Sequence, residues 1–132
     1  MDARDLRIKD IIAVKTDSRM TGYQIDNLSA KYADIQAVVD SNELFTDLRI
    51  ADLVGIPITE FWLDVMGAMY DAVKVEYAIP VKCAGHIFLR PSLGEDTFIV
   101  VWMYKKRQQY KKITYIHELQ HFVWDTVRAD IF

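Results

Sequence analysis

The chain has a single cysteine, Cys83, among its 132 residues. One cysteine excludes an intramolecular disulfide framework and any CxxC zinc site, and we expect a buried thiol in a reducing cytoplasm. No long apolar run follows the charged residues 1–7, so we expect neither a signal peptide nor a membrane span. The net charge is only −3, and such weak global electrostatics do not favour nucleic acid as a partner.

The sequence is rich in apolar residues, which make up 52% of the chain, and 12% of its residues are aromatic. This composition excludes wholesale disorder, and the length suits one domain with a substantial core. We therefore expect a single domain over residues 1–132. Its two expected parts are a helical part, residues 1–73, and a small sheet with a final helix, residues 74–132.

The helical part is predicted from apolar residues that recur at helical spacing. Thr21 and Gln24 stand in capping-box spacing ahead of Leu28, Tyr32 and Ile35, which predicts a helix of about 17 residues. Gly55 and Pro57 then separate two more segments of this kind. The expected helices lie around 6–14, after Thr21, around 42–54 and around 57–73.

The second part changes character, because apolar and other residues alternate along 75–79. Alternation with period two predicts a strand, which Pro80 would end. Residues 87–89 suggest a second strand, and the continuous apolar run 97–103 suggests a third that is buried on both faces. A basic segment then leads into a final helix over about 112–129. The fold class expected is α+β, with N-terminal helices, a small three-stranded sheet and a C-terminal helix.

The final helix carries the sequence His117-Glu118-Leu119-Gln120-His121, which reads HExxH. Two histidines four residues apart project from one face of a helix, so both rings can reach one ion. The glutamate between them can act as general base on a metal-bound water. The motif therefore predicts Zn²⁺ as cofactor, His117 and His121 as metal ligands and Glu118 as the catalytic residue.

The same helix divides into an apolar arc and a polar arc when each residue is turned about 100° from the last. The polar arc holds the HExxH side chains and Asp125, and we expect both imidazoles to face solvent or a cleft. His117 and Asp125 lie about 12 Å apart along the axis, too far to share one ion comfortably. Asp125 is therefore expected to orient His121 from outside the metal shell. The apolar arc consists of Ile116, Leu119, Val123 and Val127.

The stretch from Thr97 to Asp125 resembles the ImmA/IrrE-type minimal zincins, which are small metallopeptidases of mobile elements and stress regulators. Phe98 to Trp102 resembles the family's hydrophobic strand, Arg107-Gln108 its Arg-Gln step, and 117–121 its ligand motif. The resemblance implies an acidic third ligand on a later helix, and no later helix follows here. A catalytic zinc site uses three protein ligands and a water. The remaining candidates for the third ligand are His86, Glu95, Asp96 and Asp130.

A basic segment, residues 105–112, holds five cations in eight positions, with tyrosines at or near its ends. Cations at a helix N-terminus oppose the helix dipole, so the cluster is not there to stabilise the final helix. It could bind an acidic protein surface, or phosphates and bases of a nucleic acid. Its alternative is a solvated loop. The predicted partner-binding residues are Lys105, Lys106, Arg107, Tyr110, Lys111 and Lys112.

These patterns leave three hypotheses about function. The first is a zincin-like metallopeptidase, or its inactive relative, that hydrolyses a regulatory protein by zinc-activated water. The second is a non-enzymatic protein-binding inhibitor or regulator of mobile-element type, with the basic segment and aromatic residues as its contact face. The third is a nucleic-acid-binding protein. Metal content separates the first two hypotheses, and salt-dependent binding to DNA or RNA would single out the third.

Overall fold

A computed structural model describes residues 1, 3–17, 19–38, 43–81, 85–92, 97–104, 107–129 and 131–132. The chain divides into two compact units, Met1–Ile56 and Pro57–Phe132. Each unit contains one five-stranded antiparallel sheet.

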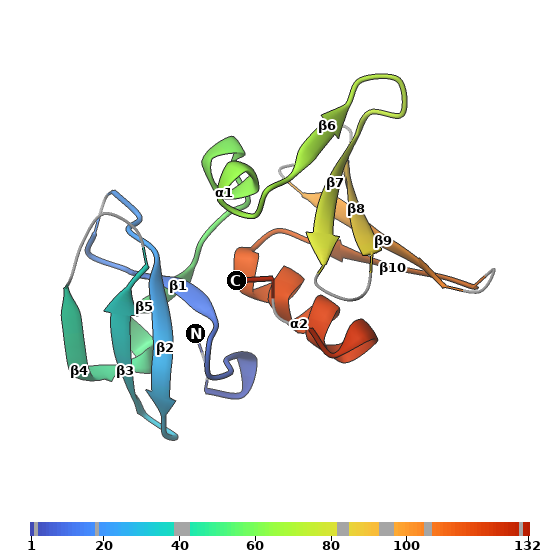
Figure 1. The fold of residues 1–132 in the computed structure, drawn as a ribbon. Coiled ribbons are helices and arrows are strands. Elements are labelled where there is room, and N and C mark those ends of the chain that lie inside the picture. The colour runs from blue at the N-terminus through green and yellow to red at the C-terminus, as the bar shows by residue number, and fades with distance from the viewer. Residues whose placement is uncertain are drawn as a thin grey trace. The chain divides into compact units, whose positions relative to one another are not determined.

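The first unit is a meander of short strands whose last member returns to the first. The strand order is β4-β3-β2-β1-β5, so β1 pairs with both β2 and β5 (Figure 1). A short 3-10 turn, η2, redirects the chain from β4 into β5. The elements are η1 (Ala3–Asp5), β1 (Ile11–Val14), β2 (Tyr23–Leu28), β3 (Tyr32–Ala37), β4 (Leu44–Arg49), η2 (Ile50–Asp52) and β5 (Leu53–Gly55).

The core of the first unit follows from alternation along its strands. In β3, Ala33 and Ile35 are buried while Tyr32 and Gln36 are exposed, as a strand with one covered face requires. The core also takes Tyr23, whose hydroxyl donates a 2.8 Å hydrogen bond to the Glu43 carboxylate. Burial, and then this bond, raise the pKa of Tyr23 to about 12. The buried cluster is Leu6, Ile12, Tyr23, Ile25, Ala33, Ile35, Ile50 and Leu53.

The second unit joins each strand to its neighbour in the chain and ends in a helix. Its strand order is β10-β9-β8-β7-β6, and α2 contacts β10 (Figure 1). The elements are α1 (Glu60–Val65), β6 (Met69–Asp71), β7 (Glu76–Val81), β8 (Gly85–Pro91), β9 (Phe98–Tyr104), β10 (Arg107–Ile113) and α2 (Ile116–Val127).

One face of this second sheet is buried. Leu89 pairs with Val100, and Ile87 pairs with Ile79, so these four side chains project from the same face. Each of them is at most 1% exposed. The apolar arc of α2 is buried as well, which confirms the arc expected for it; the side chain of Val127 lies outside the description. The buried members of the arc are Ile116, Leu119 and Val123.

The expected α+β class with N-terminal helices is wrong, because residues 1–73 contain six strands and only one short α-helix in the described part. The predicted three-stranded sheet is also wrong, since the second sheet has five strands. The C-terminal helix that carries HExxH is present, although it begins at Ile116 instead of 112. Within the described ranges, neither α-helix has the length and apolar character needed to cross a membrane.

Candidate functional site

The HExxH segment forms the first turns of α2. Tyr115 is the N-cap residue, so Glu118 occupies the third helical position. Its Oε1 atom accepts hydrogen bonds from the backbone N–H of Thr114 at 3.1 Å and of Tyr115 at 2.9 Å. This is the reciprocal part of a capping box, in which a glutamate at that position satisfies backbone donors that the helix leaves unpaired. The carboxylate of Glu118 therefore holds the start of the helix.

The two histidines of the motif lie next to each other but differ in exposure. His117 is 6% exposed, so the expectation that both rings face solvent or a cleft is wrong for this residue, while His121 is half-buried. Their ring centroids are 5.7 Å apart in an edge-to-face arrangement, and the Tyr115 ring stacks on His117 at 5.8 Å. Two imidazole rings at this separation can bind one ion together, each through one nitrogen.

The other predicted metal-site residues do not complete a site. His86 lies on β8 and is exposed, and Asp125 lies on α2 and is exposed. In the part of the chain that the structure describes, no three His, Cys, Asp or Glu side chains group closely enough to hold a metal ion. The further candidates Glu95, Asp96 and Asp130 lie outside the described residues.

These observations test whether the motif fits a catalytic zinc. The general base of such a site must reach a metal-bound water, and here one oxygen of Glu118 is held by two backbone donors at the helix start. The described residues also offer two neighbouring histidines without a third ligand. They do not fit a catalytic zinc centre, and no reaction step through a metal is derived from them.

Residues 107–112 of the predicted basic segment belong to a β-strand, β10. This strand pairs with β9 from Arg107↔Tyr104 to Ile113↔Phe98 without a shift in register. Tyr110, Lys111 and Lys112 are exposed on this strand. Lys105 and Lys106 lie outside the described residues, as does the side chain of Arg107. The interpretation of this segment as a loop is replaced by an edge strand, because β10 is the terminal strand of its sheet.

A row of apolar residues crosses the outer face of the same sheet. Directly paired residues on antiparallel strands project from the same face. The pairs Tyr110↔Val101, Val101↔Phe88, Phe88↔Ala78 and Ala78↔Met69 therefore form one line across all five strands, which we call the apolar row. Its ends are open to solvent: Met69 is 72% exposed and Tyr110 is 73% exposed.

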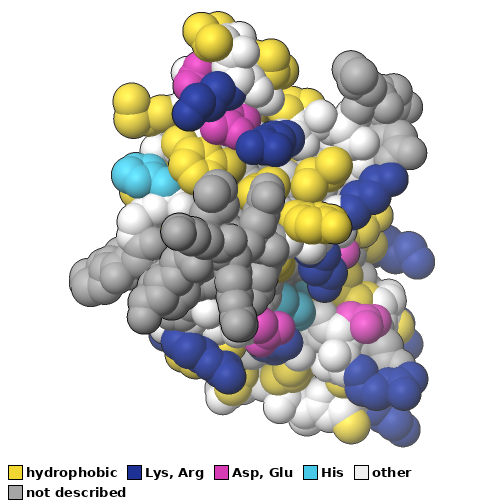
Figure 2. All heavy atoms as spheres, turned by 90° about the vertical axis from the view of Figure 1, so that its right-hand side faces the viewer, with side chains coloured by type: hydrophobic (Ala, Val, Ile, Leu, Met, Phe, Trp, Pro, Cys, Tyr) yellow, Lys and Arg dark blue, Asp and Glu magenta, His cyan; other side chains and the backbone are white. Residues whose placement is uncertain are grey.

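Charged residues flank the apolar row. Arg90 pairs with Ile99, which pairs with Lys112, so these three side chains share the outer face. The Nε atom of Arg90 lies 3.0 Å from Oε2 of Glu76, whose side chain is 5% exposed. Figure 2, which views the molecule from the right-hand side of Figure 1, shows hydrophobic side chains next to Lys and Arg side chains on the surface. By their register, Arg90 and Lys112 therefore place cations on the same face as the apolar row.

Sequence reasoning missed most of the apolar row. It named Tyr110 as a contact residue, but not Met69, Phe88 or Val101, because it predicted a strand around 97–103 that is buried on both faces. Val100 and Val101 are buried on the two faces of β9, whereas Ile99, on the same face as Val101, is 36% exposed. The signal that could have identified this face is the alternation in β8. Ile87 and Leu89 are buried there, and Phe88, which lies between them in the sequence, is half-buried on the other face.

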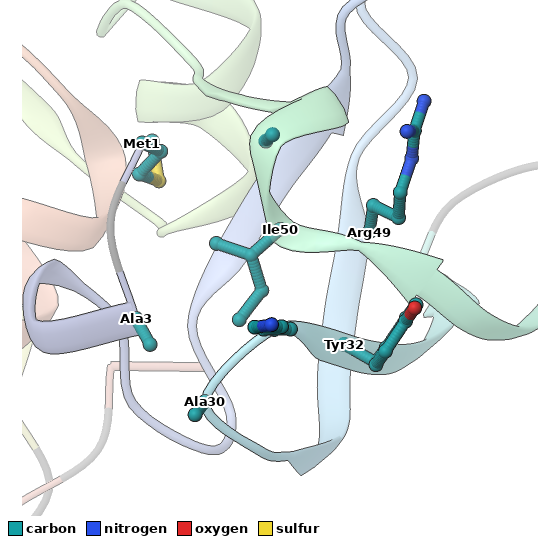
Figure 3. A pocket seen from close by; sticks show the side chains of 8 residues that line it. Met1, Ala3, Ala30, Tyr32, Arg49 and Ile50 are labelled. Carbon is teal, nitrogen blue, oxygen red and sulfur yellow. The ribbon is translucent and has the colours of Figure 1, made fainter.

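The first unit has a separate pocket of about 390 Å³. The Ile50 side chain projects into it, and Tyr32 and Arg49 stand along one side (Figure 3). Arg49 also pairs with Asp52, with 3.3 Å between Nε and Oδ2. None of the predicted site residues lines this pocket, which is formed by Met1, Ala3, Ala30, Lys31, Tyr32, Arg49, Ile50 and Ala51.

Comparisons of the chain with protein-family models, with curated proteins and with solved structures gave no match.

Proposed function

We propose that this chain is a non-enzymatic protein-binding module that contacts an acidic partner protein through the outer face of its second sheet. The observation that carries the proposal is the apolar row, which ends in the exposed side chains of Met69 and Tyr110. Val101, within the row, is 2% exposed and Phe88 and Ala78 are half-buried, so the exposed apolar area lies at the two ends of the row. Exposed apolar side chains next to polar residues are typical of interaction sites. Tyr and Met are also enriched in the centres of protein interfaces.

The sign of the partner's charge follows from the sequence around this face. The sequence from residue 98 to residue 113, which includes β9 and β10, contains five cations and no Asp or Glu, although the whole chain has a net charge of −3. Cations at the rim of an interface steer an acidic partner and speed association. An apolar row next to the cations favours a protein over a nucleic acid, whose binding is dominated by phosphate contacts. The proposal keeps the cytoplasmic location expected from the single cysteine.

The test is a peptide array that samples acidic, neutral and basic sequences, probed with the full chain and two variants. Tyr110→Ser removes one end of the apolar row, and we expect it to weaken binding to acidic sequences about tenfold. Val73→Ser is the matched control, since Val73 is 93% exposed on the turn between β6 and β7, away from the row. The proposal fails if no acidic sequence is bound, or if both variants bind like the parent chain.

A second candidate is zinc binding without catalysis by His117 and His121, whose ring centroids lie 5.7 Å apart. Its test is the zinc content of protein purified without chelator or affinity-tag metal, together with thermal unfolding in zinc and in EDTA. About one zinc per chain, lost in His117→Ala, would support it. Under the binding-module proposal, unfolding is unchanged by either addition.

A further inference from the structure

The strand β10 differs from the other sheet edges in the described part of the chain. Edge strands present unpaired N–H and C=O groups that another strand can bind, and proteins usually blunt them by shortness, bulges or proline. β5 and β6 have three residues each. β4 has an irregular register with β3, and its Asp47 adopts a positive φ of 52°. These three edges are therefore poor templates for strand addition.

β10 has none of those protections. It is seven residues long, contains no proline, and keeps a continuous register with β9 over all seven positions. No described strand pairs with its other side. What remains as protection is charge, since Lys111 and Lys112 are exposed on it. Lysines repel a strand of like charge and attract an acidic one.

The charges also decide between a second copy of this chain and a different partner. Two copies of β10 paired edge to edge would bring together two strands that each carry three cations and no Asp or Glu, and like charges on neighbouring strands repel each other. An acidic segment in the same place would lie about 4.8 Å from β10, within reach of both lysines. Tyr110 shares the outer face with Lys112, so an apolar residue opposite Tyr110 would extend the apolar row by one strand.

We propose that β10 receives an extended acidic segment of the partner as a sixth strand of the second sheet. This inference deepens the proposed function and rests on it. Backbone hydrogen bonds along β10 provide affinity, and side-chain pairs provide selection. The segment places acidic residues opposite Lys111 and Lys112, on both faces of the added strand, and an apolar residue opposite Tyr110.

The experiment uses the full chain and a fluorescent peptide of about eight residues with a central Glu-Glu-Val triplet, which antiparallel pairing places opposite Lys112, Lys111 and Tyr110. Two further peptides have the same sequence, with N-methyl groups on the odd-numbered residues in one and on the even-numbered residues in the other. Methylation removes backbone donors and keeps the charge. We expect the peptide whose methyl groups point toward β10 to bind at least about tenfold more weakly. We also expect alternate amides of residues 107–113 to gain protection from hydrogen exchange on binding of the first peptide.

Two charge variants complete the design. Lys111→Glu with Lys112→Glu should abolish binding of the Glu-Glu-Val peptide, whereas Lys15→Glu with Lys74→Glu changes exposed cations elsewhere and should leave it within about twofold. Equal binding of parent and methylated peptides, without amide protection in β10, overturns strand addition and leaves the proposed function standing. Absence of binding by any acidic peptide, or preference for single-stranded RNA, overturns both.

Discussion

Glu118 accepts a hydrogen bond from the backbone N–H of Tyr115, with 2.9 Å between Oε1 and N, and so closes the first turn of the helix that carries HExxH. A metallopeptidase would use the same carboxylate as a base for water. Capping and catalysis make opposite demands on this residue, because a cap must stay bound to the backbone and a base must exchange protons with a reactant. Substitution of Glu118 separates the two roles.

Glu118→Ala should lower the free energy of unfolding by about 1 kcal/mol, since two backbone donors at the start of α2 lose their acceptor. Urea unfolding followed by circular dichroism measures this loss. Glu118→Gln keeps an acceptor oxygen at the same position and should retain most of the stability. A Glu118→Ala variant as stable as the parent would contradict the capping role.

Arg90→Ala should destabilise the chain by about 1–3 kcal/mol, because it leaves the buried carboxylate of Glu76 without the cation 3.0 Å away. The Arg90 side chain is itself half exposed, which keeps the expected loss below that of a fully buried pair. Arg49→Ala is the control: it breaks the more exposed Arg49–Asp52 pair and should cost under about 1 kcal/mol. Equal losses in the two variants would show that burial of Glu76 is unimportant.

Val75→Gly should raise the free energy of unfolding by up to about 1 kcal/mol. Val75 has φ of 54°, a backbone conformation that β-branched residues rarely adopt and glycine adopts without strain. Its side chain is half exposed, so little burial is lost. Val73→Gly, two positions earlier in the same turn, has no positive φ to relieve and should be neutral or destabilising. Comparing the unfolding midpoints of both variants with that of the parent checks the prediction.

Stability should fall between about pH 10 and pH 12 because of Tyr23. Its folded pKa is raised to about 12 from an ordinary value of 10, so in this window the unfolded chain releases the phenolic proton and the folded chain keeps it. The contribution is fully present below pH 10 and is lost as pH rises through the folded pKa. Tyr23→Phe should remove this component from a series of urea unfolding curves, and an unchanged pH profile in the variant would contradict it.

The helices predicted for residues 1–73 were wrong because the spacing of the apolar residues fits both a helix and a strand. Leu28, Tyr32 and Ile35 are spaced as on a helix, yet the structure buries Ala33 and Ile35 and exposes Tyr32, the alternation of a strand. β3 is stabilised by pairing with β2 and β4, and such non-local hydrogen bonds leave no local trace in the sequence. The strands β7, β8 and β9 overlap the predicted ones, because their alternating or apolar runs are pronounced.

The candidate site was misjudged for two physical reasons. β10 was interpreted as a basic segment without regular structure, because its exposed central residues give it no hydrophobic period, and only its pairing with β9 identifies it as a strand. The helix was predicted to begin at 112 and begins at Ile116. That shift moves Glu118 from the middle of a helix to its third position, where a glutamate is favoured for capping alone.

The return of β5 to β1 has a consequence for the order of events in folding. The pair Ile12↔Gly55 spans nearly the whole first unit, whereas every strand pair of the second sheet joins neighbours in the chain. Distant pairings form slowly, and local hairpins close within microseconds. During synthesis the first unit therefore keeps one side of β1 unpaired until residues 53–55 have left the ribosome. The second sheet can assemble hairpin by hairpin, but α2 follows all of its strands in the chain, so the surface that α2 covers is completed only after β10 has been made.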